Sequence, residues 1–284
     1  MKLFTAFDIH YASPAIAMFR SIATTNRIRS MTVLSVGMTE AQKRWIQQRA
    51  WLDLEFFDVS IPENLATSLW FTPTVYARLL GPALLNDRRL LYMDPDVLVV
   101  DDLTPLSTLD MKGHPVAAAQ SIATPTISSP LGIREAEKLG LNPEALYLSA
   151  GVLLIDRDRW IESDITDRSF SYATRGTALR MADQEALNYA LNGNWQRLHL
   201  RWNQETGLRE PTHQHRYMIS RYFDKTEVLE ATLNPGIVHF NGPEKPWRVK
   251  SNDRWSRRWL AIRSLRMRNV EGSEESSLVW PVQA

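Results

Sequence analysis

Short apolar runs alternate with helical patterns through the first hundred residues of the chain. The apolar runs lie at residues 2–7, 31–36 and 54–59. Between them, segment 13–25 carries Pro14 near its start, and Thr39 precedes Gln42 by the three positions of a capping box. Strands that alternate with helices are typical of a parallel sheet covered on both faces. The pattern therefore predicts an α/β fold with a mostly parallel central sheet.

The alternation is less regular in the rest of the chain. Further apolar runs predict strands at 90–93, 97–100, 116–119, 147–155 and 236–240. Helical patterns are present at 73–85, which Gly81-Pro82 interrupts, and at 183–191, which has an acidic first turn. Segment 123–132 is rich in Ser, Thr and Pro and is predicted to be a loop. We expect one α/β domain over residues 1–247 and a tail over 248–284.

Composition narrows the classes of protein to consider. Hydrophobic residues make up 44% of the chain and charged residues 23%, which is ordinary for a folded globular protein. The net charge of +1 excludes a chain-wide positive field, so no nucleic-acid partner is expected. The chain has no cysteine, so a disulfide framework and thiolate chemistry are excluded. Residues 1–8 lack the basic start of a signal peptide, and we expect a cytoplasmic protein, free or peripheral on the inner face of the membrane.

The tail is the basic part of the chain. Residues 248–268 contain eight Lys and Arg against one Asp, a net charge of +7. On a helical wheel, Trp255, Trp259 and Ile262 share one face. Two interpretations follow: a helix that packs its tryptophans on the domain, or a segment that binds an anionic membrane surface, where basic residues are favourable.

Two aspartates separated by one residue lie between predicted strands. In an extended segment, residues i and i+2 point to the same side, so Asp94 and Asp96 can converge on one point. Carboxylates bind hard divalent cations such as Mg²⁺ and Mn²⁺, and the C-terminal ends of parallel strands face the crevice where α/β sheets bind ligands. The alternative is an ordinary acidic turn, because a D-x-D pattern also occurs by chance.

A histidine at the end of the last predicted strand is the candidate third ligand. His239 is followed by Gly242 and Lys245. Neutral imidazole suits Mn²⁺, and lysine suits phosphate as a point charge. The rival metal pair is His213-x-His215, which lies in a polar stretch and is predicted to be a surface loop.

Taken in order, these motifs resemble the family-8 retaining glycosyltransferases, which have the GT-A fold. The resemblance covers nearly the whole chain, and the segment from His239 to Trp247 (H-x-x-G-x-x-K-P-W) is its most specific part. The other similar segments are Ala6-Phe7-Asp8-Ile9-His10-Tyr11, Tyr76-Ala77-Arg78-Leu79, Asp94-Pro95-Asp96, residues 147–155 (YLSAGVLLI), Asp183-Gln184-Glu185-Ala186-Leu187-Asn188 and Trp202-Asn203.

The resemblance implies a metal-dependent hexosyltransferase with a UDP-sugar as donor. Asp94, Asp96 and His239 would bind Mn²⁺ or Mg²⁺ against the two phosphates. Asp183 would hold the sugar, and Gln184 would lie near the anomeric carbon; these two are the implied catalytic residues. The residues implied to contact the nucleotide or the donor sugar are Ala6, Asp8, His10, Tyr11, Arg78, Asp94, Ser149, Ala150, Gly242 and Lys245.

The implied reaction transfers glucose or galactose from UDP-glucose or UDP-galactose to a glycan or lipid-linked glycan, such as a lipopolysaccharide core, with an α-linkage. Ser149 and Glu185 replace the family's Asn and second Asp at positions that border the sugar and the acceptor. Two alternatives stay open: a nucleotide-sugar-binding module without turnover, and a self-glucosylating initiator similar to glycogenin.

Overall fold

The computed structural model describes residues 1–66, 71–176, 178–249 and 253–265. Its centre is a seven-stranded sheet with the strand order β3-β2-β1-β4-β7-β6-β8. All pairs in this sheet are parallel except the two made by β7, which runs against both β4 and β6. The strands are β1 (Lys2–Phe7), β2 (Ser30–Ser35), β3 (Asp53–Asp58), β4 (Arg89–Met93), β6 (Val116–Gln120), β7 (Leu148–Asp156) and β8 (Gln196–Leu198). The mostly parallel sheet predicted from the sequence is confirmed, and β8 is a strand that the apolar pattern did not reveal.

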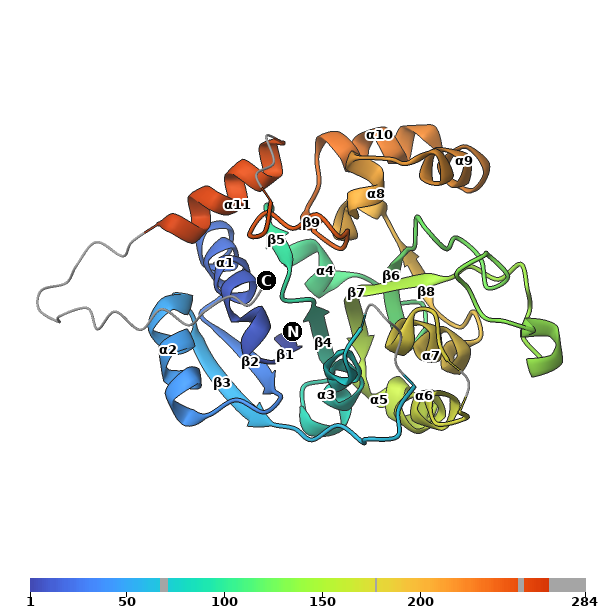
Figure 1. Cartoon of the computed structure of the whole chain (residues 1–284), viewed down its shortest axis with the longest axis horizontal. Coiled ribbons are helices and arrows are strands. Elements are labelled where there is room, and N and C mark those ends of the chain that lie inside the picture. Colours follow the sequence, from blue (N-terminus) through green and yellow to red (C-terminus); the bar gives the residue numbers. More distant parts are fainter. Residues whose placement is uncertain (67–70, 177, 250–252, 266–284) are drawn as a thin grey trace, which may run out of the picture.

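Two of the predicted strands form a separate small sheet. β5 (Val97–Val99) and β9 (Ile237–His239) pair antiparallel, and in their register Val97 lies opposite His239. The turn between β4 and β5 therefore faces the end of β9, although about 140 residues of chain separate them. Figure 1 shows this small sheet above the ends of β4 and β7.

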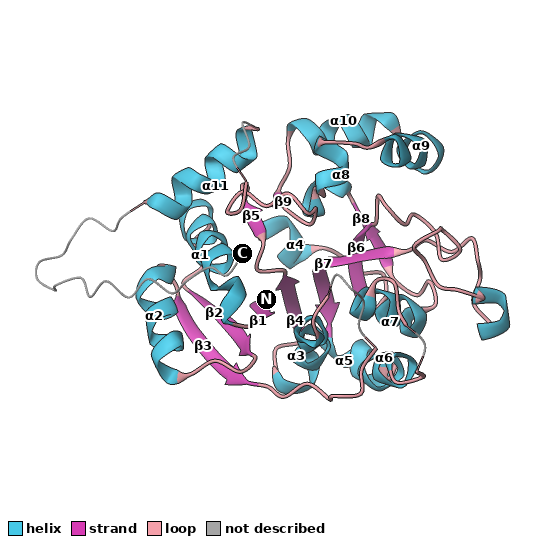
Figure 2. Ribbon diagram, viewed as in Figure 1, coloured by secondary structure: helices cyan, strands magenta, loops and turns pink. Residues whose placement is uncertain are grey.

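Helices cover both faces of the central sheet (Figure 2). Alternate residues of the inner strands supply the two halves of the core: Phe4, Leu90 and Tyr92 pack with α6 and α7, whereas Leu3 and Leu91 pack with α1 and α2. The helices are α1 (Ala12–Thr25), α2 (Glu40–Ala50), α3 (Gly81–Leu84), α4 (Thr104–Thr108), α5 (Arg157–Glu162), α6 (Ile165–Ala173), α7 (Ala182–Leu191), α8 (Thr206–Arg209), α9 (His213–Tyr222), α10 (Lys225–Leu233) and α11 (Arg254–Ser264), with 3-10 turns η1 (Ile9–Tyr11), η2 (Pro73–Leu80), η3 (Ala136–Leu139) and η4 (Leu200–Asn203).

Three predictions about local structure need comment. The capping box at Thr39 and Gln42 is present at the start of α2. The helix predicted at 73–85 is divided, with a 3-10 turn to Leu80 and a new helical turn that begins at Gly81-Pro82. The surface loop predicted around His213-x-His215 is wrong: α9 begins at His213, because Thr212 and His215 form a capping box.

The basic tail contains one described helix, α11, which packs against α1 (Figure 1). Trp255, Trp259 and Ile262 are buried with Leu98 and Phe240, as the first of the two interpretations predicted. The buried guanidinium of Arg20 donates to the carbonyls of Arg263 and Leu265, 2.8 Å to each, and so caps the C-terminal end of α11. Within the described residues, no helix is long and apolar enough to cross a membrane. Residues 266–284, which include Arg266 and Arg268, lie outside the described residues.

Candidate functional site

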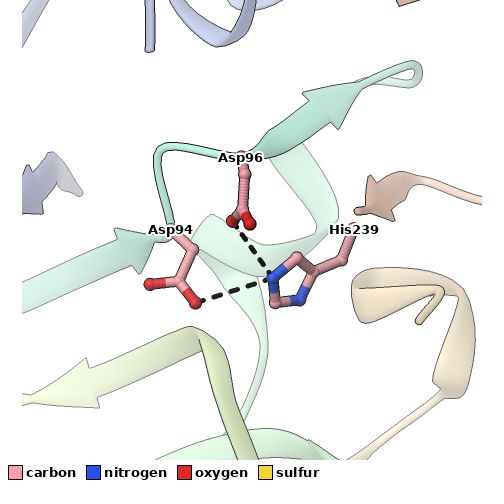
Figure 3. Close-up of side chains that lie close together, drawn as sticks. All are labelled: Asp94, Asp96 and His239. Atoms are coloured by element: carbon pink, nitrogen blue, oxygen red, sulfur yellow. Dashed lines mark ion pairs between the residues drawn. The ribbon is translucent and has the colours of Figure 1, made fainter. Parts of the chain in front are cut away.

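The two aspartates and the histidine come together at the edge between the two sheets. Asp94 directly follows β4, Asp96 directly precedes β5, and His239 ends β9. The Nε2 atom of His239 lies 3.2 Å from Asp96 Oδ1 and 3.6 Å from Asp94 Oδ2 (Figure 3). One ligand atom from each of the three residues lies within 4.8 Å of the others. Two carboxylates and an imidazole that converge in this way form a donor set that could hold a metal ion.

A glycine makes room for this arrangement. A Cβ atom at Gly151 of β7 would lie 2.3 Å from His239 Cε1 and 3.2 Å from Asp94 Oδ2. The first distance is far below van der Waals contact, so any other residue would displace the imidazole from the two acids. Residue 151 therefore has to be glycine for His239 to reach its position.

A lysine supplies positive charge next to the acids. Lys245 Nζ lies 2.7 Å from Asp96 Oδ2 and also donates to the carbonyl of Phe240. Burial alone would raise the pKa of the Asp96 carboxyl, but the ammonium group of Lys245 and the contact with His239 hold it below its ordinary value. Asp96 is consequently a permanent anion, as a cation ligand has to be.

A buried arginine links Asp94 to the start of α7. Arg78 Nη2 lies 2.9 Å from Asp94 Oδ1, and its Nε lies 2.9 Å from Asp183 Oδ2. Its guanidinium also lies over the ring of Tyr92, whose hydroxyl donates to Asp94 Oδ1 over 2.6 Å. Burial raises the pKa of Asp183 to about 7, although Arg78 opposes the shift. Asp183 is not the N-cap of α7, which is Met181; it lies inside the first turn with its side chain turned into the site.

The neighbouring residues of α7 and β7 are fixed by hydrogen bonds. Gln184 Oε1 accepts from the backbone N–H of Ala150 over 2.9 Å, and the carbonyl of Ala150 accepts from Arg78. Ser149 is buried, and its Oγ accepts from the side chain of Asn203 over 2.9 Å. The carboxylate of Glu185 accepts from the backbone N–H groups of Arg180 and Met181, so it holds the segment before α7.

Four of the predicted residues lie at or just after the C-terminal end of β1. Ala6 is buried in β1, whereas His10 is exposed in η1. Asp8 accepts from the backbone N–H of His10 and from the hydroxyl of Thr74, each over 3.0 Å. Tyr11 meets the ring of Trp247 edge-on at 6.5 Å. Burial, with Asp96 and Asp94 nearby, raises the pKa of Tyr11 to about 12, so its hydroxyl keeps its proton.

Gly242 lies in the loop after β9, beside α8. Its backbone N–H donates to Thr206 Oγ1 over 3.3 Å, and a Cβ atom at this position would come within 3.1 Å of Thr206 Cγ2. Contacts among the described residues thus join Arg78, Asp183 and Lys245 to the group of Asp94, Asp96 and His239, at the C-terminal end of β4. This is the edge where open α/β sheets bind ligands.

Sequence reasoning missed the contributions of Tyr92 and Asn203. Tyr92 reads in sequence as a core residue of β4 and is buried, yet its hydroxyl contacts Asp94. Asn203 was noted only within the Trp202-Asn203 pair, and its Oδ1 lies 2.9 Å from His239 Nδ1. The sequence around Asn203 carries little information about this contact, because its partner, His239, is 36 residues away.

Comparisons with known proteins place this geometry among sugar-transferring enzymes. The model of glycosyl transferase family 8 matches residues 2–251. General stress protein A of Bacillus subtilis (strain 168) is 28% identical over 265 residues, which cover 87% of each chain. Lipopolysaccharide 1,2-glucosyltransferase of Escherichia coli (strain K12) is 27% identical over 190 residues, or 64% of this chain and 51% of that protein.

The fold is also that of a solved glycosyltransferase. The galactosyltransferase LgtC, in complex with donor and acceptor sugar analogs, superposes with a TM-score of 0.70 at 24% identity, covering 93% of this chain and 95% of LgtC. At this identity the likeness concerns the fold alone. The GT-A type α/β architecture expected from the sequence is therefore confirmed.

Proposed function

The chain belongs to glycosyl transferase family 8, and from this premise we propose that it transfers glucose or galactose from a UDP-sugar to a glycan or glycolipid acceptor with retention at the anomeric carbon. The observation that carries the proposal is the convergence of Asp94, Asp96 and His239 beside Lys245. These residues fit a divalent cation by donor chemistry and by charge, and Gly151 leaves the space that the imidazole of His239 needs.

The residues around the acids are proposed to bind the donor. A divalent cation, Mn²⁺ or Mg²⁺, would when bound stabilise the negative charge that develops on UDP. Lys245, held at 2.7 Å from Asp96, is close enough to contact a diphosphate at this point, and the N–H of Gly242 lies in the adjoining loop. Ala6, Asp8, His10 and Tyr11 are proposed to bind the uridine, because they lie at or just after the C-terminal end of β1, the strand next to β4.

The sugar is proposed to lie against the start of α7. Arg78 and Asp183 form a buried ion pair whose hydrogen-bonding groups suit sugar hydroxyls. The Oε1 atom of Gln184 is already bound to the backbone of Ala150, which favours a positioning role for this amide near the anomeric carbon. Ala150 and Ser149 line the adjacent part of β7.

The acceptor is proposed to approach from the side of the long connection between β6 and β7. A surface pocket of about 540 Å³ there is lined by Ser129, Arg134 and Arg180, and Arg180 lies three residues before Asp183. The segment predicted as a loop at 123–132 is partly held by backbone pairing, because Thr126 forms a β-bridge to Leu146. The E. coli relative is named as a lipopolysaccharide glucosyltransferase, which supports a lipid-linked glycan as one acceptor class.

The catalytic domain is proposed to end at residue 247, and the basic tail to begin at residue 248. Contact with an anionic membrane would use arginines of α11. Trp255 and Trp259 lie on the buried face of this helix, whereas Arg257 and Arg258 are exposed. Replacement of both arginines by serine should reduce sedimentation with anionic vesicles at low salt. The domain should stay folded, since the buried face of α11 is unchanged. Equal sedimentation of the two proteins would contradict the membrane contact.

The decisive experiment is a screen of UDP-sugars for slow hydrolysis, which needs no acceptor. UDP-glucose and UDP-galactose are incubated with the protein and Mn²⁺, and UDP release is measured with and without EDTA. We expect release from one of the two donors, dependent on the cation. UDP binding without hydrolysis or transfer would instead support a nucleotide-sugar-binding module, and glucose found covalently on the protein would support a self-glucosylating initiator.

A further inference from the structure

The imidazole of His239 is held by side chains at both ring nitrogens. Its Nε2 faces Asp94 and Asp96, and its Nδ1 lies 2.9 Å from Asn203 Oδ1. The amide nitrogen of Asn203 in turn donates to Ser149 Oγ over 2.9 Å. His239, Asn203 and Ser149 are exposed by only 4%, 1% and 2%, so water does not compete for these contacts.

The pleated backbone of β7 positions two residues that make these contacts possible. Ser149 and Gly151 are two residues apart in the strand, so both face the same side of the sheet. The missing side chain of Gly151 leaves room for the imidazole, and the short hydroxyl of Ser149 lies within reach of the amide of Asn203. Three elements distant in sequence, β7, η4 and β9, are thereby joined.

The direction of each hydrogen bond follows from chemistry. An imidazole that offers the lone pair of Nε2 to a cation carries its hydrogen on Nδ1, which then needs an acceptor. The carbonyl oxygen of the Asn203 amide is that acceptor. Its NH₂ group then points to Ser149, whose hydroxyl oxygen accepts the hydrogen bond.

We propose that Asn203, supported by Ser149, is a positioning residue that fixes the orientation and the hydrogen placement of His239 for cation binding. The inference rests on the proposed cation site. It also gives a role to the serine that stands where the family's motif has asparagine, because the Ser149 hydroxyl accepts from Asn203 and so supports His239.

The test measures Mn²⁺ affinity in the presence of UDP, from the electron paramagnetic resonance signal of free Mn²⁺. Asn203→Ala should bind Mn²⁺ about 10–100-fold more weakly than the unsubstituted protein, the usual effect of losing a hydrogen-bond partner of a ligating histidine. Asn203→Asp should restore most of the affinity, because a carboxylate accepts from Nδ1–H. Ser149→Ala should weaken Mn²⁺ binding less than Asn203→Ala, since the amide oxygen is kept.

A matched control exists on the surface. His114 Nδ1 lies 2.8 Å from Asn194 Oδ1, which is the same type of contact outside the site. Asn194→Ala should leave Mn²⁺ affinity unchanged. Thermal unfolding, and UDP binding in EDTA, report whether each variant is folded.

Different results separate the two hypotheses. Folded Asn203→Ala with unchanged Mn²⁺ affinity, or Asn203→Asp as weak as Asn203→Ala, would show a merely structural role and overturn the inference alone. If Asn203→Ala does not fold, unchanged Mn²⁺ affinity in Ser149→Ala overturns it. Absence of Mn²⁺ binding by the unsubstituted protein with UDP would overturn the proposed cation site and the inference together.

Discussion

Two buried acids at opposite ends of the site have opposite electrostatic environments. Asp96 lies 2.7 Å from Lys245 and 3.2 Å from His239, and its pKa is held low. Asp183 shares a cationic partner, Arg78, with Asp94, and burial raises the pKa of Asp183 to about 7. The comparison shows that burial by itself does not decide the charge of a carboxylate; the charges and hydrogen-bond donors beside it also matter.

The difference matches the two proposed tasks. A cation ligand has to stay ionised, and the contacts with Lys245 and His239 lower the pKa of Asp96. A residue that binds sugar hydroxyls gains from a carboxyl whose charge is only partly balanced, because its oxygens can still accept hydrogen bonds. Four experiments test this division between the Asp96 end and the Asp183 end.

The largest effect is expected at the Asp96 end. Asp96→Asn removes a cation ligand and the partner of Lys245, so transfer should fall by about 10³-fold or more, and Mn²⁺ affinity should fall with it. The control is Asp101→Asn, which removes an exposed partner of Arg201 outside the site and should leave the rate unchanged. Full activity in Asp96→Asn would disprove its role as a ligand.

The second experiment follows stability with pH in EDTA. The folded pKa of Asp183, about 7, exceeds its ordinary value of 3.8, so between these two pH values the folded protein holds a proton that the unfolded chain has lost. The free energy of unfolding therefore falls as pH rises from about 4 to about 7, by up to about 4 kcal/mol. Measured against Asp183→Asn by denaturant unfolding, the unsubstituted protein should lose stability over this range. Parallel pH profiles would contradict the shift.

The third experiment separates chemistry from nucleotide binding. Asp183→Asn should slow transfer by about 10²-fold, the size expected when one group that stabilises the transition state is lost. UDP and Mn²⁺ affinities should stay close to those of the unsubstituted protein, because Asp183 contacts Arg78 and none of the proposed phosphate-binding residues. Calorimetric titration with UDP checks this, and an equal loss in affinity would show that the two ends act as one unit.

The smallest effect is expected from the lysine. Lys245→Ala should weaken UDP binding by about 10-fold, because a charge-assisted contact contributes about 1.5–3 kcal/mol. Lys138→Ala is the control, since Lys138 pairs with Glu135 on the surface. If UDP affinity is unchanged, Lys245 serves only to balance Asp96.

Local sequence determined most of the secondary structure and the candidate residues. Short apolar runs predicted β1 and β4, the Thr39 capping box predicted the start of α2, and the D-x-D and H-x-x-G-x-x-K patterns predicted the acids, the histidine and the lysine. These signals act over a few residues, so they can be read without knowing the fold. Short-range sequence context also led to one wrong prediction. His215 was expected in a loop, but its side chain caps α9.

The tertiary structure decided which of these residues meet. Only the pairing of β5 with β9 brings His239 opposite Val97 and hence to Asp96, and only the packing of β7 against η4 brings Ser149 to Asn203. The same holds for α11, whose tryptophans form one face in sequence but are buried because α1 and β5 lie beneath them. A contact between residues 36 to 145 positions apart depends on how all the intervening elements pack, and no periodicity or spacing in one segment carries that information.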